Sequence, residues 1–364
     1  MSSSIFRLAV VALSLLTTTV SAFADDPKPA KQLFGAVKLP SRSEPESLGF
    51  YAKGCLAGGV AIPSDGPTWQ VLHPTRNRRW GNPRMIALVE KLSRDARAKD
   101  GWNGLLIGDI SQPRGGPMLN GHASHQIGLD ADIWLTPMPD RRLTYAERDN
   151  FPENSVLRKG TLYVDPNKWT RAHADVIMQA ASYPEVERIF VHPGIKKKLC
   201  ETWKGDVATL SKVRPMYGHH YHFHIRIKCP PGSVGCTPQV APPTDSGCGK
   251  PLADWFAKLK PRPVPKYVNK PVKKPTKPVK PTYLTLRSLP NACTAVLNSK
   301  SVTSMAAAEY GVPANDDVAA VTETAFAAPS DAAATVAFRS IEDFSDLLPR
   351  GEVPVPLERP GEQW

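Results

Sequence analysis

Beyond its N-terminal segment, the 364-residue chain lacks any apolar run approaching the roughly 18–20 residues that a membrane-spanning helix needs. It also lacks a Cys-x-x-Cys pair, which disfavours a metal site built from its six cysteines. Residues 258–281 contain no acidic residue, although the whole chain carries 34 Asp and Glu. These absences argue against a protein with several membrane spans and show that charge is unevenly distributed along the chain.

The first 24 residues have the features of a secretory signal. Arg7 supplies the positive charge, Leu8–Leu16 is apolar apart from Ser14, and Ala-Phe-Ala at 22–24 is a small-x-small cleavage site. We predict cleavage after Ala24 and export to the periplasm, an uncleaved anchor being the alternative. Export argues against a nucleic-acid partner, despite the formal net charge of +12.

Three regions of different composition follow the signal at 1–24. Residues 25–257 mix apolar, polar and turn residues as a globular domain does. Residues 258–290 form a Lys/Pro-rich spacer, which we expect to stay extended and which could tether the protein to an anionic wall or membrane surface. Residues 291–364 form an acidic, Ala-rich tail that we expect to be mostly disordered.

Helical and strand-like patterns alternate within 25–257. The spacing of apolar residues predicts helices at 82–96 and 172–181 and strands at 105–110, 129–135, 186–191 and 220–228. Residues 220–228 alternate cleanly between apolar and polar, and 129–135 alternates with Asp130, Asp132 and Trp134 on one face, as in strands with one polar face. The combination predicts an α+β fold with a central, mostly antiparallel sheet, flanking helices and one face open to solvent.

Six of the nine histidines fall into two short windows. The first window holds His122 and His125, and the second holds His219, His220, His222 and His224. A single His-x-His or His-x-x-His is usually no more than the polar face of a strand or a chance pair. The basic run from 219 to 228 could equally be a solvated or polymer-binding strip.

Together the windows favour a zinc site. Zinc prefers imidazole nitrogen and carboxylate oxygen, and a catalytic zinc has about three protein ligands. His222 and His224 are two apart on a predicted strand, so their rings point to the same face. Pairing of the two polar strands would place His125, Asp132 and His224 around one metal ion, with His222 beside it as a base.

The spacing His125-x6-Asp132 and His222-x-His224 resembles that of the zinc peptidases of the lysostaphin and D-alanyl-D-alanine carboxypeptidase group. Longer runs resemble the penicillin-insensitive murein endopeptidases more closely, over about residues 45–260 with Cys293 beyond them. These runs are LIGD at 106–109, GHASHQ at 121–126, GLD at 128–130, DI at 132–133, RIFV at 188–191, VRP at 213–215 and the six cysteines. The run at 121–126 with its downstream aspartate is specific to this family.

The resemblance implies a set of zinc ligands, namely His125, Asp132 and His224, with His122 as an additional metal contact. The family also has an Asp-x-x-His motif between the two clusters that can take a further metal. No such motif occurs here, so a second metal site stays open.

The resemblance also implies the catalytic groups. His222 would be the general base, and His219 a second catalytic histidine that stabilises the oxyanion. We expect Asp130 to support the site from behind the ligands, a strand-end carboxylate being the alternative. No serine or cysteine nucleophile takes part in this chemistry, so no acyl-enzyme forms and β-lactams have no target.

Cysteine pairing cannot be deduced from the residues alone, because six cysteines in an exported protein allow fifteen connectivities. Cys229 and Cys236 are close enough to close a small loop. The resemblance implies three disulfides, Cys55–Cys293, Cys200–Cys248 and Cys229–Cys236, the first of which would tie the far side of the spacer back to the domain.

By resemblance, the substrate is the D-alanyl–meso-diaminopimelate cross-link of peptidoglycan. Arg226 and Lys228, on the basic face of the last strand, are candidates to attract its carboxylates, a solvated strand end being the alternative for Lys228. A zinc D,D-carboxypeptidase, an L-alanoyl-D-glutamate peptidase and a non-catalytic wall-binding module stay as alternatives. Cleavage of diaminopimelate–diaminopimelate links and the oligomeric state, including a homodimer, are left open.

Overall fold

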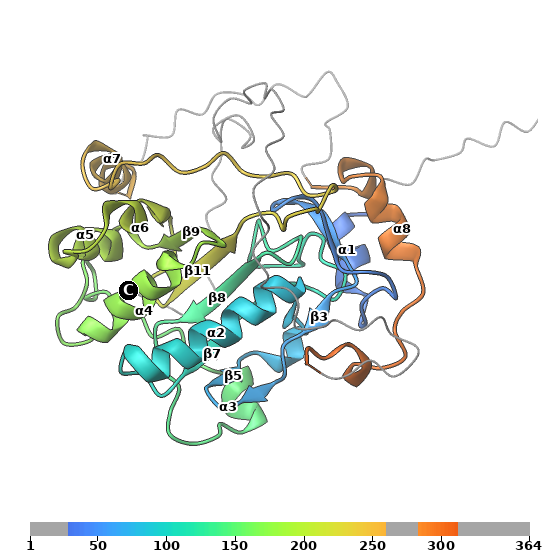
Figure 1. The fold of residues 1–364 in the computed structure, drawn as a ribbon, viewed down its shortest axis with the longest axis horizontal. Coiled ribbons are helices and arrows are strands. Elements are labelled where there is room, and N and C mark those ends of the chain that lie inside the picture. The colour runs from blue at the N-terminus through green and yellow to red at the C-terminus, as the bar shows by residue number, and fades with distance from the viewer. Residues whose placement is uncertain (1–27, 260–282, 312–364) are drawn as a thin grey trace, which may run out of the picture.

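The computed structural model of the protein describes residues 28–259 and 283–311 (Figure 1). The predicted signal, most of the basic spacer and the tail beyond 311 lie outside the described residues. The described elements are α1 (Ala30–Gly35), β1 (Glu46–Phe50), β2 (Lys53–Ala57), β3 (Val60–Ala61), β4 (Asp65–Gly66), β5 (Trp69–Val71), η1 (Pro74–Arg76), β6 (Trp80–Gly81), α2 (Pro83–Lys99), β7 (Leu105–Ile107), β8 (Asp130–Trp134), α3 (Tyr145–Asp149), α4 (Arg171–Ser182), β9 (Val186–Val191), α5 (Pro193–Thr202), α6 (Val207–Lys212), β10 (Val213–Pro215), β11 (His222–Ile227), α7 (Lys250–Leu259), η2 (Leu286–Ser288), α8 (Ala292–Asn298) and η3 (Ala306–Ala308).

A seven-stranded mixed sheet forms the centre of the fold, in the order β10-β9-β11-β8-β7-β5-β4. The central strand β11 pairs antiparallel with both β8 and β9, whereas β10–β9 and β5–β7 are parallel pairs. The predicted α+β class and the mostly antiparallel sheet with flanking helices are therefore confirmed. The register sets His224 opposite Asp132 and His222 opposite Trp134.

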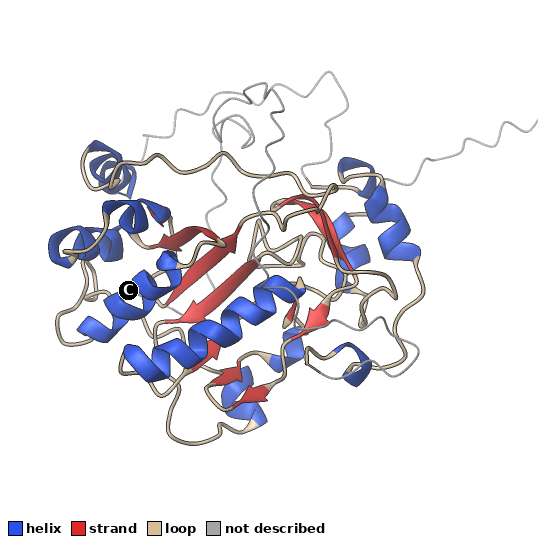
Figure 2. Ribbon diagram, viewed as in Figure 1, coloured by secondary structure: helices blue, strands red, loops and turns tan. Residues whose placement is uncertain are grey.

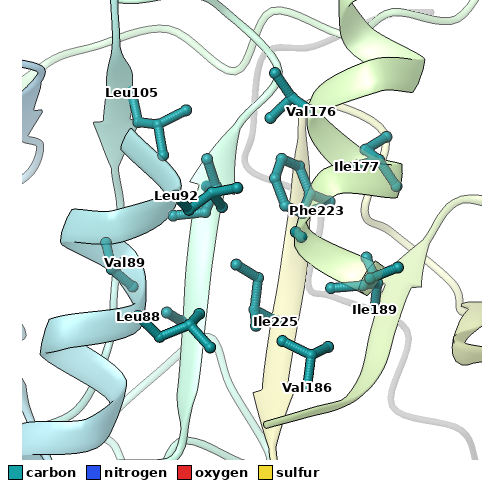
Figure 3. Close-up of a cluster of buried hydrophobic side chains, with 14 of the residues drawn as sticks. Leu88, Val89, Leu92, Leu105, Val176, Ile177, Val186, Ile189, Phe223 and Ile225 are labelled. Carbon is teal, nitrogen blue, oxygen red and sulfur yellow. The ribbon is translucent and has the colours of Figure 1, made fainter. Parts of the chain in front are cut away.

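One face of this sheet is covered by two of the predicted helices, α2 and α4, which lie side by side across it (Figure 2). Alternation along the strands turns Phe223 and Ile225 of β11 toward these helices. There they meet apolar side chains such as Leu92 of α2 and Val176 of α4 in one buried cluster (Figure 3). The apolar period of each element thus fixes which strand residues remain for the opposite face.

That opposite face is not open to solvent, so this part of the prediction is wrong. Every residue of β8 and β11 is buried. Irregular segments cover the polar side chains and hydrogen-bond to them or to their strands. The backbone N–H of Asp132 donates to the carbonyl of Asp109, and Arg226 Nη1 donates to Gln239 Oε1 at 2.8 Å. The polar face is therefore an enclosed cluster of ionisable groups rather than a wetted surface.

Residues 283–311, assigned from composition to the spacer and tail, pack against the domain. Cys293 and Val296 of α8 share an apolar cluster with Phe34 of α1. Arg114 Nη1 donates to the carbonyls of Val296 at 2.7 Å and Leu297 at 2.6 Å. The few apolar residues of this segment are enough to dock it because a disulfide holds it in place.

All six cysteines form disulfides, which pair Cys55 with Cys293, Cys200 with Cys248 and Cys229 with Cys236. These are the pairs that the family resemblance implies. No thiol is left to act as a nucleophile, and three disulfides fit a protein that folds in an oxidising, exported environment. Within 28–259 and 283–311, no helix is both long enough and apolar enough to span a membrane.

Candidate metal centre

The two central strands bring the predicted ligands together. Asp130 and Asp132 of β8 and His222 and His224 of β11 project from the same face of the sheet, because each pair is two residues apart. The antiparallel register places His224 directly opposite Asp132. The distance between His224 Nδ1 and Asp132 Oδ1 is 3.3 Å.

His125 reaches the same point from the loop before β8. Its backbone is left-handed, with φ of 65°, a conformation that is uncommon for residues other than glycine and is often found at functional sites. Two hydrogen bonds hold it there, from its N–H to Asp130 Oδ2 at 2.9 Å and from its Nδ1 to the Ile110 carbonyl at 2.7 Å. The fully buried ring is thereby aimed at β8 and β11.

The protonation of the two rings follows from their partners. His125 Nδ1 faces a carbonyl oxygen, and His224 Nε2 lies 2.9 Å from Asp130 Oδ1. Both oxygens only accept hydrogen bonds, so these ring nitrogens carry the protons of the neutral imidazoles. The other two nitrogens, His125 Nε2 and His224 Nδ1, are then bare acceptors that lie 3.2 Å apart.

A third acceptor completes the group. Asp132 Oδ1 lies 3.5 Å from His125 Nε2 and, although buried, finds no hydrogen-bond donor in the described part of the chain. Metal–ligand bonds of about 2.0–2.2 Å in a tetrahedral zinc site place ligand atoms about 3.3–3.6 Å apart, and these three atoms lie 3.2, 3.3 and 3.5 Å apart. The donor set, the spacing and the orphaned carboxylate oxygen fit a zinc-sized cation.

Protons are the natural competitors for this position. Burial lowers the pKa of His224, which favours the neutral, ligating ring. Burial opposes the charging of His125 as well, but the carboxylate of Asp132 outweighs it and raises the pKa of His125. In the absence of a cation, a proton on His125 Nε2 would therefore partly balance the carboxylate.

His122 lies at the outer edge of this centre. Its Nε2 is 3.5 Å from Asp132 Oδ2, and its ligand atom, with those of His125 and Asp132, forms a group within 4.8 Å of one another. The same nitrogen lies 3.0 Å from Asp109 Oδ2. The side chain is 22% exposed, so His122 borders the solvent side of the site.

His222 and His219 lie beside the ligands. His222 Nε2 is 3.6 Å from Asp132 Oδ1, and its ring stacks on Trp134 with centroids 5.6 Å apart. Burial lowers the pKa of His222 to about 4, so its ring is neutral at pH 7. His219 is left-handed, with φ of 52°, and its ring centroid is 4.9 Å from that of His222.

Asp130 is the support on which the ligands depend. Its two oxygens accept from the His125 backbone N–H, from His224 Nε2 and from Arg226 Nε, the last at 2.7 Å. Arg226 therefore forms an internal ion pair with Asp130. Arg226 is only 4% exposed and is not the basic surface residue that we expected. Lys228 is exposed, but it follows the end of β11 that lies away from His222.

Replacing Asp130 with asparagine should lower the free energy of unfolding by about 3–5 kcal/mol, because the buried Arg226 loses its counter-ion. If the site binds zinc, its affinity should fall by about 10–100-fold, since the His224 ring loses a charged acceptor. Urea denaturation and metal titration measure the two effects. An Asp130→Asn/Arg226→Met double variant should recover stability but not zinc affinity. If it is as unstable as the single variant, the ion pair is not the cause.

Sequence patterns did not single out Asp109, Arg78 or Arg76 as site residues. Asp109 Oδ2 accepts from Arg78 Nη1 at 2.8 Å and from His122 Nε2. Burial opposes ionisation of Asp109, but His122 and the arginines hold its pKa below the usual range. Arg78 precedes His122 by 44 positions in the sequence and has no periodic pattern around it. The run LIGD, which ends at Asp109, was therefore the one sequence signal for the cluster of Asp109 and the two arginines.

An enclosed group of imidazoles and carboxylates on an α+β sheet, with bare acceptors converging on one point, is typical of metallopeptidases. A family model for penicillin-insensitive murein endopeptidases matches residues 47–298, which include all of these residues. The chain belongs to this family, peptidase family M74, and is thus a peptidase of the murein endopeptidase class.

Individual relatives carry the same description. A penicillin-insensitive murein endopeptidase of Haemophilus influenzae is 42% identical over 228 residues, which cover 62% of this chain and 79% of the relative. One from Klebsiella pneumoniae subsp. pneumoniae is 35% identical over 273 residues, 75% of this chain and 95% of the relative. One from Salmonella heidelberg is 36% identical over 237 residues, 65% and 84% of the two chains.

Proposed function

We propose that the protein is a zinc-dependent endopeptidase that hydrolyses the D-alanyl–meso-diaminopimelate cross-links of peptidoglycan. The observation that supports it most is the convergence of three bare acceptor atoms, from His125, Asp132 and His224, next to an uncommitted neutral imidazole, His222. The matched family and relatives are murein endopeptidases, which favours an endopeptidase over the two exopeptidase alternatives.

His125, Asp132 and His224 would hold the zinc ion, and His122 would contact it from the solvent side. When bound, the ion supplies Lewis acidity, which polarises a peptide carbonyl and acidifies water at the site. Asp130 fixes the His224 tautomer and the His125 backbone, so the protein positions the acceptors before any ion arrives.

His222 is suited to move the proton. Its Nε2 can take a proton from the attacking water and return it to the leaving amine, because burial keeps the ring neutral at rest. His219 Nδ1 donates to the Tyr217 carbonyl at 2.8 Å, and burial lowers its pKa well below the usual range. The negative charge that develops on the substrate oxygen would favour a second proton, on His219 Nε2, which then stabilises that oxygen.

This chemistry requires no covalent bond between enzyme and substrate. Every cysteine is in a disulfide, and water is the nucleophile. β-Lactams inactivate enzymes by acylating a nucleophilic side chain, so they have nothing to attack in this site. The mechanism therefore agrees with the penicillin insensitivity for which the family is named.

Mass spectrometry of cross-linked dimeric muropeptides tests the proposal. Incubation with the zinc-loaded enzyme should convert a dimer into two monomers by addition of one water. Loss of a single terminal residue would indicate a carboxypeptidase, and cleavage nearer the glycan an L-alanoyl-D-glutamate peptidase. Binding to sacculi without any released fragment would indicate a wall-binding module, and full activity with metal shown to be absent would rule out zinc dependence.

We further propose that the mature protein works in the periplasm after cleavage at Ala24. Its three disulfides support export. Mass spectrometry of the protein recovered from periplasmic extracts should find Asp25 at its N-terminus.

The basic spacer would then bind the anionic wall or membrane surface. Replacing the Lys and Arg residues of 260–280 with glutamine should weaken binding to sacculi at low salt and have less effect at high salt, where charges are screened. A co-sedimentation assay at several salt concentrations measures this. Cleavage of a soluble muropeptide by the same variant serves as the control and should not change. Equal sacculus binding at low salt would show that the spacer is not a tether.

A further inference from the structure

A cross-link substrate carries carboxylates, and Arg226, which we expected to attract them, is buried in an internal ion pair. Arg226 Nε and Nη2 donate to Asp130, and its Nη1 donates to Gln239. A different cation must therefore face the substrate, and one arginine next to the metal centre has a guanidinium that is largely uncommitted.

That arginine lies on a strained turn that a neighbouring helix holds in place. Residues 74–76 form η1, and the residues on either side, His73 and Asn77, are both left-handed, with φ of 51° and 53°. Asp149 of α3 braces the turn, accepting from Thr75 Oγ1 at 2.6 Å and from the Thr75 N–H at 3.1 Å. Such strain persists only where the surroundings enforce it, and it is concentrated at functional sites.

The turn directs Arg76 toward the metal centre. Arg76 Nη1 lies 3.3 Å from Asp109 Oδ2, the oxygen that also accepts from His122 Nε2 at 3.0 Å. His122 Nε2 is in turn 3.5 Å from Asp132 Oδ2. A chain of three contacts, through Asp109 and His122, thus connects the Arg76 guanidinium to a carboxylate of the candidate zinc site.

Asp109 does not need Arg76 to balance its charge. The buried carboxylate of Asp109 already has a closer cationic partner, Arg78 Nη1 at 2.8 Å, and a hydrogen bond from His122. Arg76 makes one long contact to Asp109, and its side chain is 40% exposed. Asp109 is the hydrogen-bond and ion-pair partner that Arg76 has among the described residues, which leaves most of the guanidinium donors free to bind a ligand.

We propose that Arg76 forms a carboxylate-binding subsite for the substrate. The carbon that bears the scissile nitrogen in the cross-link also bears a free carboxylate, so this group enters the site next to the bond that is cut. The guanidinium would bind it through paired hydrogen bonds, a geometry that arginine provides and lysine does not. The inference rests on the proposed cross-link substrate and deepens it, assigning Arg76 to substrate selection.

Two matched substrates separate this role from a structural one. One is a cross-linked muropeptide dimer with the free carboxylate, and the other carries a carboxamide at that position. The zinc-loaded wild type should prefer the carboxylate in kcat/KM by about 10–100-fold, as expected for a hydrogen-bonded ion pair. Arg76→Gln should lose this preference, Arg76→Lys should keep only part of it, and Arg94→Gln, on an exposed face of α2, should behave as wild type.

An Arg76 that merely supports Asp109 predicts a different result, because its loss would slow both substrates by the same factor. A wild type without preference would likewise overturn the proposal. Direct binding of the two dimers to a His222→Ala variant, with and without Arg76→Gln, is measured in parallel by calorimetry. If the wild type cleaves neither dimer, the proposed function fails. The Arg76 proposal is then decided by whether Arg76→Gln removes a preference in binding.

Discussion

Cleavage of cross-linked muropeptides by a His222→Ala variant is expected to be about 10³-fold slower than by wild type, within the range that general bases contribute. The variant should still fold and bind one zinc ion. Its kcat/KM is measured on a purified dimer, its metal content by atomic absorption and its folding by circular dichroism. Activity should fall through kcat rather than KM if His222 acts on the proton and not on substrate binding.

The geometry explains why the loss should be confined to chemistry. His222 Nε2 is close to Asp132 Oδ1, but three other imidazole nitrogens, from His122, His125 and His224, also lie within 3.5 Å of that carboxylate. The His222 Nδ1 atom has no hydrogen-bond partner among residues 28–259 and 283–311, so alanine leaves no partner unsatisfied there.

His220→Ala is the matched control, since it removes an imidazole two positions away whose ring contacts are with His192 and Tyr221 rather than with the ligands. It should keep activity within a few-fold of wild type. Full activity of His222→Ala would show that another group moves the proton. Loss of zinc from His222→Ala would instead assign His222 to the ligands.

Prediction from the sequence succeeded where the repeat of apolar and polar residues along a strand determines which face a side chain lies on. The alternation in 129–135 and 220–228 predicted two strands, and a period of two is enough to put Asp130 with Asp132 and His222 with His224 on common faces. The antiparallel register then brings the two sets together, because each strand can turn only its apolar residues toward the helices.

Prediction from the sequence failed where irregular loops determine whether a side chain is buried or exposed. The cover over the polar face comes from segments without regular structure, such as that from Asp109 to Gly128, whose path no periodicity encodes. Alternating polar residues therefore looked like a solvated face, and Arg226 like a surface cation. The turn that carries Arg76 is also not marked by glycine in the sequence, although its flanking residues His73 and Asn77 are both left-handed.

Within the tail that composition predicts to be mostly disordered, residues 291–311 are folded against the domain. Averaged over an acidic, Ala-rich tail, the segment has too little apolar surface to fold. Folding is local, however, and α8 contributes Val296 and a cysteine bonded to Cys55 over a sequence separation of 238 residues. The disulfide and the two arginine-to-carbonyl hydrogen bonds hold the segment against α1 and β2, so it does not need a core of its own.

Replacing Asp132 with asparagine should abolish zinc binding and reduce cleavage to background. Among the described residues, Asp132 is the carboxylate that lies within 3.5 Å of both bare ring nitrogens, His125 Nε2 and His224 Nδ1, and its Oδ1 is left without a hydrogen-bond donor. Asparagine has nearly the same shape but no charge, and it places an NH2 group or a weaker acceptor at the centre of the ligand set. The loss should therefore come from the ligand chemistry and not from packing.

Thermal unfolding with and without zinc gives a readout that is independent of activity. At a zinc concentration about a thousandfold above the dissociation constant, the wild type should gain about 4 kcal/mol of stability, and Asp132→Asn should gain none. Asp140→Asn, an exposed substitution of the same kind, should respond to zinc as the wild type does. If Asp132→Asn still binds one zinc ion per molecule, Asp132 is not a ligand and the metal is held by other residues. A wild type whose midpoint ignores zinc, and whose activity survives a chelator, would mean that these converging acceptors bind no catalytic metal.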